Sequence, residues 1–131
     1  MNFETGSPTV LILDDDVAFI LWLGELFTES GYRPFPALNS RQAVSLAKKL
    51  AGPVDILLVN PSLPGTRRVI DFLAAAQPNL RVLLIHDPST PGAAADSAYP
   101  TVERPLAGER VSKAEWMIKI RKMLMRSAAG Q

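Results

Sequence analysis

Polar residues that could do chemistry stand directly after apolar runs in this sequence. They are the acids Asp14, Asp15 and Asp16, the carboxamide of Asn60, the imidazole of His86 and the guanidinium of Arg104. Clustered carboxylate oxygens are the ligands that a hard cation such as Mg²⁺ prefers. We therefore expect an acidic pocket at Asp14 and Asp15. The alternative interpretation is that Asp15 or Asp16 caps the helix that follows.

The apolar runs before these residues have the character of buried parallel strands. Ile56–Val59 is a continuous apolar run bounded by turn-forming residues, which is typical of a central strand buried on both faces. Thr9–Leu13 and Arg81–Ile85 are expected to be neighbouring strands. In open α/β sheets the functional crevice lies outside the carboxyl ends of the strands, so the polar residues that follow these runs should meet there.

The expected second strand, Arg33–Pro36, is restricted by its prolines. Pro34 and Pro36 both lack a backbone N–H, and at a spacing of two they leave the same side of the strand without donors. This strand is therefore expected at an edge of the sheet. A strand order of 2-1-3-4-5, in which the second strand is outermost, satisfies that requirement.

Helical periodicity, caps and stop signals indicate helices between the strands. The expected helices are Asp16–Ser30, one that starts at the pair Asn39 and Gln42 and ends before Gly52-Pro53, Arg67–Ala76, and one that starts at the capping box Ser112–Glu115. The fifth strand is expected at Tyr99–Glu103. The segment between the fourth and fifth strands is rich in proline and lacks amphipathic spacing, so a helix there should be short or missing.

The first expected helix carries more apolar residues than its buried face needs. Its sheet-facing residues are Phe19, Ile20, Leu23, Leu26 and Phe27. Val17 and Leu21 point nearly the opposite way, and Trp22 sits on the flank. Such a surplus can mark a partner surface, although a single exposed leucine is also ordinary.

Composition limits the classes of protein to which this chain can belong. Its 131 residues suit one domain, expected at residues 9–126 with a loose lead-in at 1–8 and a frayed tail at 127–131. The net charge of +1 provides no field to attract nucleic acid or an anionic membrane. The chain has no cysteine, which suits a reducing cytoplasm, and its longest apolar run, Val17–Leu23, is too short to span a bilayer.

The order of these features resembles the receiver domain of two-component response regulators, over nearly the whole chain. The resemblance rests on Asp14 and Asp15 after the first strand, on Asn60 after the central strand, and on Arg104-Pro105 after the last strand. It implies an α/β fold with a five-stranded parallel sheet in the order 2-1-3-4-5 and helices on both faces. It also implies a signalling partner, such as a histidine kinase or an output protein, and no enzymatic activity. A homodimer remains open.

The chain departs from the family at the site itself. In the family the central strand ends in an aspartate that accepts a phosphoryl group, and the neutral carboxamide of Asn60 cannot form that acyl phosphate. His86 stands where the family has a serine or threonine, and Thr101 where many members have an aromatic switch residue. Arg104 replaces the lysine before Pro105, whose peptide bond is often cis in the family. With no nucleophile or second metal ligand beside it, His86 is interpreted as a polar plug.

These departures predict a degenerate receiver that works as a phosphorylation-independent interaction module. No cofactor is expected, and Mg²⁺ should bind Asp14 and Asp15 weakly or not at all, because Asn60 removes a negative charge. Arg104 is expected to replace the metal by hydrogen bonding to Asp14, Asp15 or Asn60. Two alternatives stay open. One is phosphorylation of another acidic residue, with Asp55, Asp16 and Asp87 as the candidates. The other is a flavodoxin-like cofactor-binding protein, although the acidic residues 14–16 would repel a cofactor phosphate.

Overall fold

A computed structural model describes residues 6–50, 52–89, 98–105 and 110–129 of the chain, with side chains up to residue 125. The described residues form alternating strands and helices. In chain order they are β1 (Thr9–Leu13), α1 (Val17–Glu29), β2 (Arg33–Ala37), α2 (Ser40–Lys49), β3 (Ile56–Val59), α3 (Thr66–Ala76), β4 (Arg81–His86), β5 (Thr101–Glu103) and α4 (Lys113–Ala129). No helix among these residues is long and apolar enough to cross a bilayer.

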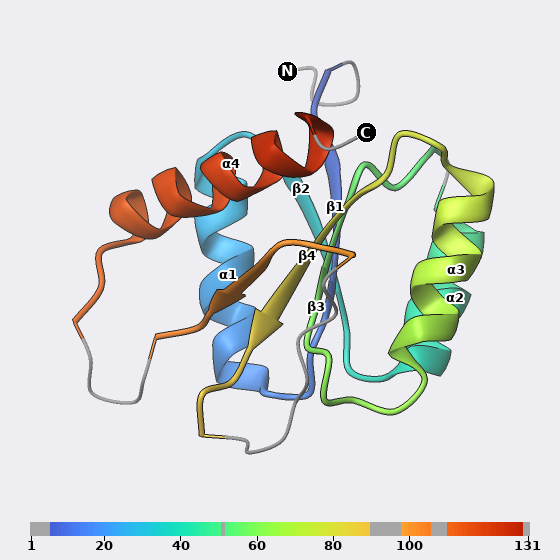
Figure 1. Cartoon of the computed structure of the whole chain (residues 1–131), viewed down its shortest axis with the longest axis horizontal. Helices are drawn as coiled ribbons and strands as arrows, with labels where there is room; N and C mark the ends of the chain where they lie inside the picture. The colour runs from blue at the N-terminus through green and yellow to red at the C-terminus, as the bar shows by residue number, and fades with distance from the viewer. Residues whose placement is uncertain (1–5, 51, 90–97, 106–109, 130–131) are drawn as a thin grey trace.

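The strands form one parallel sheet in the predicted order, β2-β1-β3-β4-β5. Helices α1 and α4 cover one face of this sheet, and α2 and α3 cover the other (Figure 1). Because every strand runs in the same direction, all carboxyl ends lie at one edge, where the polar residues of the candidate site follow.

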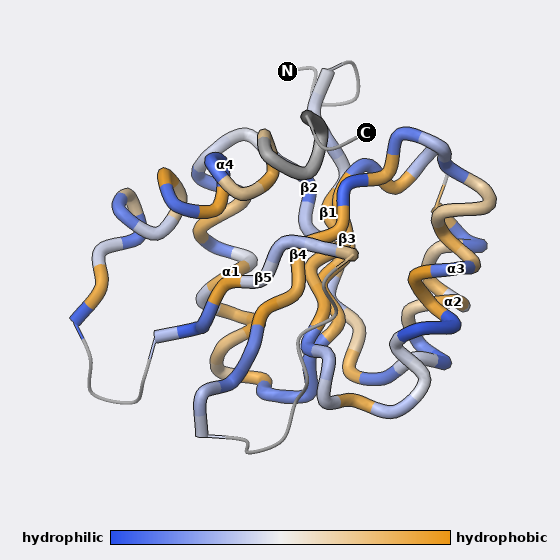
Figure 2. Tube along the Cα trace, viewed as in Figure 1, coloured by the Kyte–Doolittle hydropathy of each residue, from blue (hydrophilic) through white to orange (hydrophobic). Residues whose placement is uncertain are grey.

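Burial of the strands on both faces explains why they are continuous apolar runs. All residues of β1 and β3 are buried, and Figure 2 shows the apolar strands in the middle of the molecule with most hydrophilic residues in the surrounding helices and loops. The core divides into two clusters. One packs Ile12, Leu58 and Ile85 against α1 and α4, and the other packs strand residues against α2 and α3.

The prolines of β2 lie where the sequence predicted, on the open edge of the sheet. The N–H of Arg33 donates to the carbonyl of Pro8 at 2.8 Å, so the odd-numbered residues of β2 direct their N–H groups toward β1. Pro34 and Pro36 therefore occupy positions whose N–H would point away from the sheet. The edge position of β2 is confirmed.

The helix caps expected from the sequence are present. Asp16 Oδ1 accepts the N–H of Phe19 at 3.2 Å, so Asp16 caps α1. Asn39 accepts the N–H of Gln42 at 2.8 Å, and the Gln42 carboxamide accepts the N–H of Leu38, one residue before the cap. The hydroxyl of Ser112 accepts the N–H of Glu115 at 3.0 Å. Each side-chain acceptor satisfies a helix N–H that lacks an intrahelical partner.

Several boundaries differ from the prediction. Strand β5 begins at Thr101 and not at Tyr99, since Pro100 has no N–H to donate and contributes only its carbonyl, to Leu84 N–H at 2.9 Å. Helix α4 continues to Ala129, past the expected domain end at residue 126. The prediction of a short or missing helix concerns mainly residues 90–97, which lie outside the described residues.

An aromatic cluster joins α1 to α4. Trp22 stacks on Phe19 with ring centroids 6.2 Å apart and lies 5.3 Å from the ring of Trp116. Trp22 is therefore half-buried against α4, whereas Val17 and Leu21 remain 55% and 65% exposed. Of the partner surface predicted on α1, Val17 and Leu21 are freely exposed, and Trp22 serves mainly to pack the two helices together.

Candidate functional site

Two polar side chains are buried together at the carboxyl edge of the sheet. Asp14 and Asn60 follow the adjacent strands β1 and β3 and are only 3% and 6% exposed. Backbone hydrogen bonds fix both residues, because Asp14 N–H donates to Ala37 at 3.1 Å and Asn60 N–H donates to Leu13 at 2.9 Å. The predicted convergence of these two residues is confirmed.

The oxygen of the Asn60 carboxamide is engaged in the turn that follows β3. It accepts the backbone N–H of Ser62 at 3.0 Å and the hydroxyl of Ser62 at 2.7 Å, and the Asn60 side chain also lowers the pKa of Asp14. A carboxamide can donate and accept at once, whereas an ionised carboxylate only accepts. Ser62 was not predicted, although asparagine side chains often bond the backbone two residues later in turns.

Burial dominates the electrostatics of Asp14. Desolvation raises the pKa of its carboxyl above 3.8, while the backbone N–H of Asp16, 3.0 Å from Oδ1, acts in the opposite direction. The charge of Arg104 and the hydrogen bond from Asn60 also favour the ionised form, and the neighbouring Asp15 disfavours it. Asp15 itself is exposed, so only Asp14 of the predicted pair lies inside the pocket.

Arg104 is held between two carboxylates at the mouth of the crevice. Nη1 lies 3.1 Å from Oδ2 of Asp16, and Nη2 lies 2.9 Å from Oδ2 of Asp87. The guanidinium also lies 5.1 Å from the centroid of the Phe19 ring, and the Arg104 side chain is only 17% exposed. The ion pairs therefore join the start of α1 to the segments that follow β4 and β5.

The prediction that Arg104 bonds Asp14, Asp15 or Asn60 is wrong about its partners. Its two Nη atoms instead contact Asp16, which caps α1, and Asp87, which follows β4. Arg104 still acts on Asp14 through its charge. The peptide bond between Arg104 and Pro105 is trans.

The two predicted switch positions belong to the β4–β5 ladder. His86 is the last residue of β4 and not the first residue after it, and it pairs with Glu103. Its Nδ1 lies 3.7 Å from Oε2 of Glu103, so the imidazole contacts a carboxylate of β5. Thr101 opens β5 opposite Leu84. The role of His86 as a plug stays a prediction.

Few oxygen ligands around Asp14 are available to a divalent cation. In the described part of the chain, no three His, Cys, Asp or Glu side chains gather closely enough to hold a metal ion. The Asn60 oxygen already accepts two hydrogen bonds from Ser62, and the positive charge of Arg104 lies nearby. These features fit poorly with Mg²⁺, and weak metal binding stays a prediction.

The alternative phosphoacceptors are engaged elsewhere. Asp16 and Asp87 pair with Arg104. Asp55 lies at the opposite, amino-terminal edge of the sheet, as predicted, where Oδ2 accepts the N–H of Thr9 at 2.7 Å. None of the three therefore takes the position that Asn60 occupies.

Solved structures of receiver domains superpose on nearly all of this chain. A signal receiver domain of an HD domain-containing protein from Pseudomonas fluorescens Pf-5 matches with a TM-score of 0.69 and 17% identity, over 94% of this chain and 98% of that one. A response regulator receiver protein from Sinorhizobium medicae WSM419 gives 0.68 and 15%, over 93% and 98%. The chain has the receiver-domain fold.

Similarity in sequence to one relative covers a smaller part of this chain. Sporulation initiation phosphotransferase F of Bacillus subtilis is 28% identical over 81 residues, which are 60% of this chain and 64% of that protein. The match thus spans less than two thirds of that relative. No family model matches the chain. The receiver fold is shown by structure, and the role of this chain in signalling is a matter for proposal.

Proposed function

We propose that this chain is a receiver domain of two-component signalling that binds its partner without being phosphorylated. The observation that carries the proposal is Asn60, which ends the central strand where an active receiver presents its aspartate. A neutral carboxamide lacks the charge to attack a phosphodonor. The proposal draws further support from the receiver fold and from the similarity to a sporulation phosphotransferase.

The surroundings of Asn60 favour a structural role for this residue. Its oxygen accepts two hydrogen bonds from Ser62, and its side chain favours the ionised form of Asp14. Arg104 is held by Asp16 and Asp87, and its fixed positive charge acts on Asp14 from there. We infer that these contacts stabilise one conformation of the pocket and that no phosphoryl transfer takes place there.

The partner surface that we propose is the outer side of α1. Val17 and Leu21 are more than half exposed there. Beside them a groove of about 420 Å³ runs between α1 and β2, and its apolar lining includes Ile12, Ile20, Leu21, Pro34 and Pro36. An amphipathic helix of a histidine kinase or an output protein would bury its apolar face in such a groove.

The test is incubation with Mg²⁺ and a small-molecule phosphodonor, followed by intact mass measurement. We expect the mass of the natural protein to stay unchanged. A stable phosphoryl adduct would overturn the proposal, and locating it on Asp16, Asp55 or Asp87 would establish the alternative receiver. A receiver of known activity, treated in parallel, checks the phosphodonor.

Partner binding is tested with the protein recovered in a pull-down. Leu21→Glu should weaken binding of the purified partner roughly tenfold or more, because it places a charge in the apolar groove. Ile118→Glu is the matched control, since Ile118 is similarly exposed at 56% but lies on α4. Equal loss in both variants would place the partner elsewhere, and a second copy of this chain as the recovered partner would establish a homodimer.

A further inference from the structure

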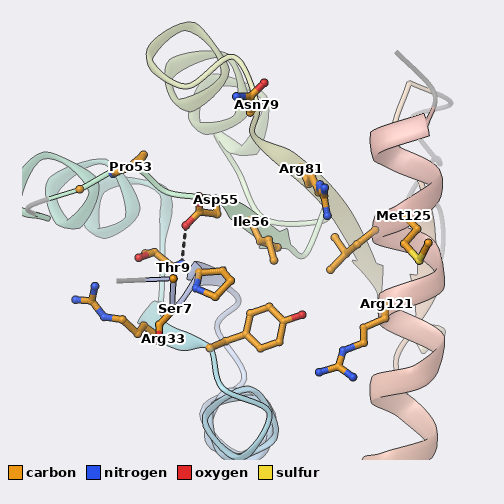
Figure 3. Close-up of a pocket in the computed structure, with 15 residues that line it drawn as sticks. Ser7, Thr9, Arg33, Pro53, Asp55, Ile56, Asn79, Arg81, Arg121 and Met125 are labelled. Carbon is orange, nitrogen blue, oxygen red and sulfur yellow. Dashed lines mark hydrogen bonds between the residues drawn. The ribbon is translucent and has the colours of Figure 1, made fainter. Parts of the chain in front are cut away.

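A second hollow lies at the amino-terminal edge of the sheet, opposite the crevice of Asp14 and Asn60. It measures about 700 Å³ and is bounded by the start of β1, the ends of β3 and β4 that lie farthest from the crevice, and α4 (Figure 3). This volume is in the range of pockets that hold small molecules. Neither the candidate site nor the proposed partner groove uses it.

Arg81 directs its guanidinium into this hollow. It is the first residue of β4, and its backbone is fixed by an N–H that donates to the carbonyl of Asp55 at 3.0 Å. Figure 3 shows the side chain turned toward the space between Ile56 and Arg121. Among the described residues the Arg81 guanidinium has no carboxylate partner.

Arg121 enters the same hollow from α4. Its guanidinium lies 6.0 Å from the centroid of the Tyr32 ring, which holds it near the opposite wall. Tyr32 is itself anchored, because its N–H donates to Phe27 at 2.9 Å and its ring packs edge-on against Phe27 at 5.2 Å. Within the described part of the chain, Arg121 also makes no ion pair with a carboxylate.

The other charged residues that the structure describes along this hollow do not neutralise the pair. Asp55 points to Thr9, whose N–H it accepts at 2.7 Å, and not toward Arg81 (Figure 3). Arg33 also lines the hollow, but its guanidinium stacks over the Phe35 ring at 5.6 Å and turns away from Arg121 in Figure 3. Among the described residues, two guanidinium groups thus share one hollow without an acid between them.

The composition of the walls indicates what this hollow can bind. Guanidinium groups match the geometry of phosphate oxygens and can bond them through two N–H groups each. Ile56, Leu124 and Met125 provide an apolar wall beside the Tyr32 ring. We propose that the hollow binds a phosphorylated small molecule with an attached aromatic group, of the size of a mononucleotide, through Arg81 and Arg121.

The experiment is a titration of the full chain, followed by calorimetry and by amide chemical shifts. The probes are adenosine monophosphate, ribose 5-phosphate, inorganic phosphate and adenosine. We expect adenosine monophosphate to bind most tightly, ribose 5-phosphate and inorganic phosphate more weakly, and adenosine most weakly of all. Affinity should fall with added salt, because the contacts are ionic. Tight binding of inorganic phosphate alone would overturn the role of the apolar wall.

Matched arginine variants locate the binding. Arg81→Ala and Arg121→Ala should each weaken adenosine monophosphate binding roughly tenfold or more, as expected for a lost charged hydrogen bond. Arg41→Ala makes the same charge change on the exposed surface of α2 and should leave affinity unchanged. No binding by any probe at millimolar concentration, or equal loss in all three variants, would overturn the proposal. Neither result would bear on the role of Asn60.

Discussion

Nη2 of Arg104 lies 2.9 Å from Oδ2 of Asp87, and both side chains keep only 17% of their surface exposed. The same guanidinium reaches Asp16 at 3.1 Å, so one arginine ties together the ends of β4 and β5 and the start of α1. The pair with Asp87 is shielded from water, so removing Arg104 would leave the Asp87 carboxylate uncompensated. Arg104 therefore fixes the positions of these three segments relative to one another.

Arg104→Ala should lower the free energy of unfolding by about 1–3 kcal/mol, because two carboxylates lose a charged hydrogen bond. Urea denaturation of both proteins measures the difference. Arg110→Ala removes the same charge from an exposed residue and should change stability by less than about 0.5 kcal/mol. If the two variants lose equally little, the ion pairs of Arg104 contribute nothing to the fold.

Asn60→Asp tests the carboxamide at the centre of the site. The new carboxylate would face Asp14, and two buried carboxylates this close repel each other. The variant should be less stable than the natural protein without metal, and Mg²⁺ should raise its melting temperature by binding between the two acids.

Asn60→Ala is the control for that experiment, because it removes the carboxamide but adds no charge. Its melting temperature should not respond to Mg²⁺. A response as large in Asn60→Ala as in Asn60→Asp would show that the metal binds at another place, and the proposed charge balance of the pocket would be wrong.

The sequence predicted the sheet well because the relevant signals are local. Buried parallel strands need continuous apolar runs, and Pro34 with Pro36 can occupy only an edge. The same reasoning found Asp14 and Asn60, since strand ends fix where a short side chain lies. It also found the caps Asp16 and Ser112, whose partners are only three residues away.

Features that depend on distant residues were not accessible from the sequence. The guanidinium of Arg104 is long enough to reach any of several acids, and its choice of Asp16 and Asp87 depends on how α1 and β4 are placed. The sequence suggested that Trp22 could bind a partner. Its contact with Trp116 was not foreseen, because it joins two helices far apart in the chain. Arg81 and Arg121 are likewise far apart in the chain, so the sequence did not reveal that they line one hollow.

The pH dependence of stability should reveal the burial of Asp14. Its pKa in the folded protein is raised above 3.8, so the folded state holds this proton more tightly than the unfolded state does. Stability contributed by this group is therefore lost as the pH rises from 3.8 through the raised value. Asp14→Asn removes that loss while its carboxamide oxygen can still accept the N–H of Asp16.

Asp14→Asn should accordingly be more stable than the natural protein at neutral pH, with a gain that shrinks as the pH falls toward 3.8. Chemical denaturation across this range measures the effect. Asp15→Asn makes the same change in charge on an exposed residue and should show a much smaller dependence on pH. Parallel curves for the two variants would mean that Asp14 is not the desolvated group.

Gly65→Ala tests the turn that leads from Asn60 into α3. Gly65 caps this helix with a φ of +80°, a left-handed conformation that costs other residues about 1–2 kcal/mol. A Cβ at this position would also lie 2.8 Å from the hydroxyl oxygen of Ser40, which donates to the carbonyl of Pro64. The free energy of unfolding should fall by at least this conformational cost, as measured by urea denaturation.

Gly52→Ala is the control, because an added Cβ there meets nothing within 4 Å and φ is not positive. It should change stability far less. An equal loss in both variants would show that the left-handed turn is not what requires glycine at position 65.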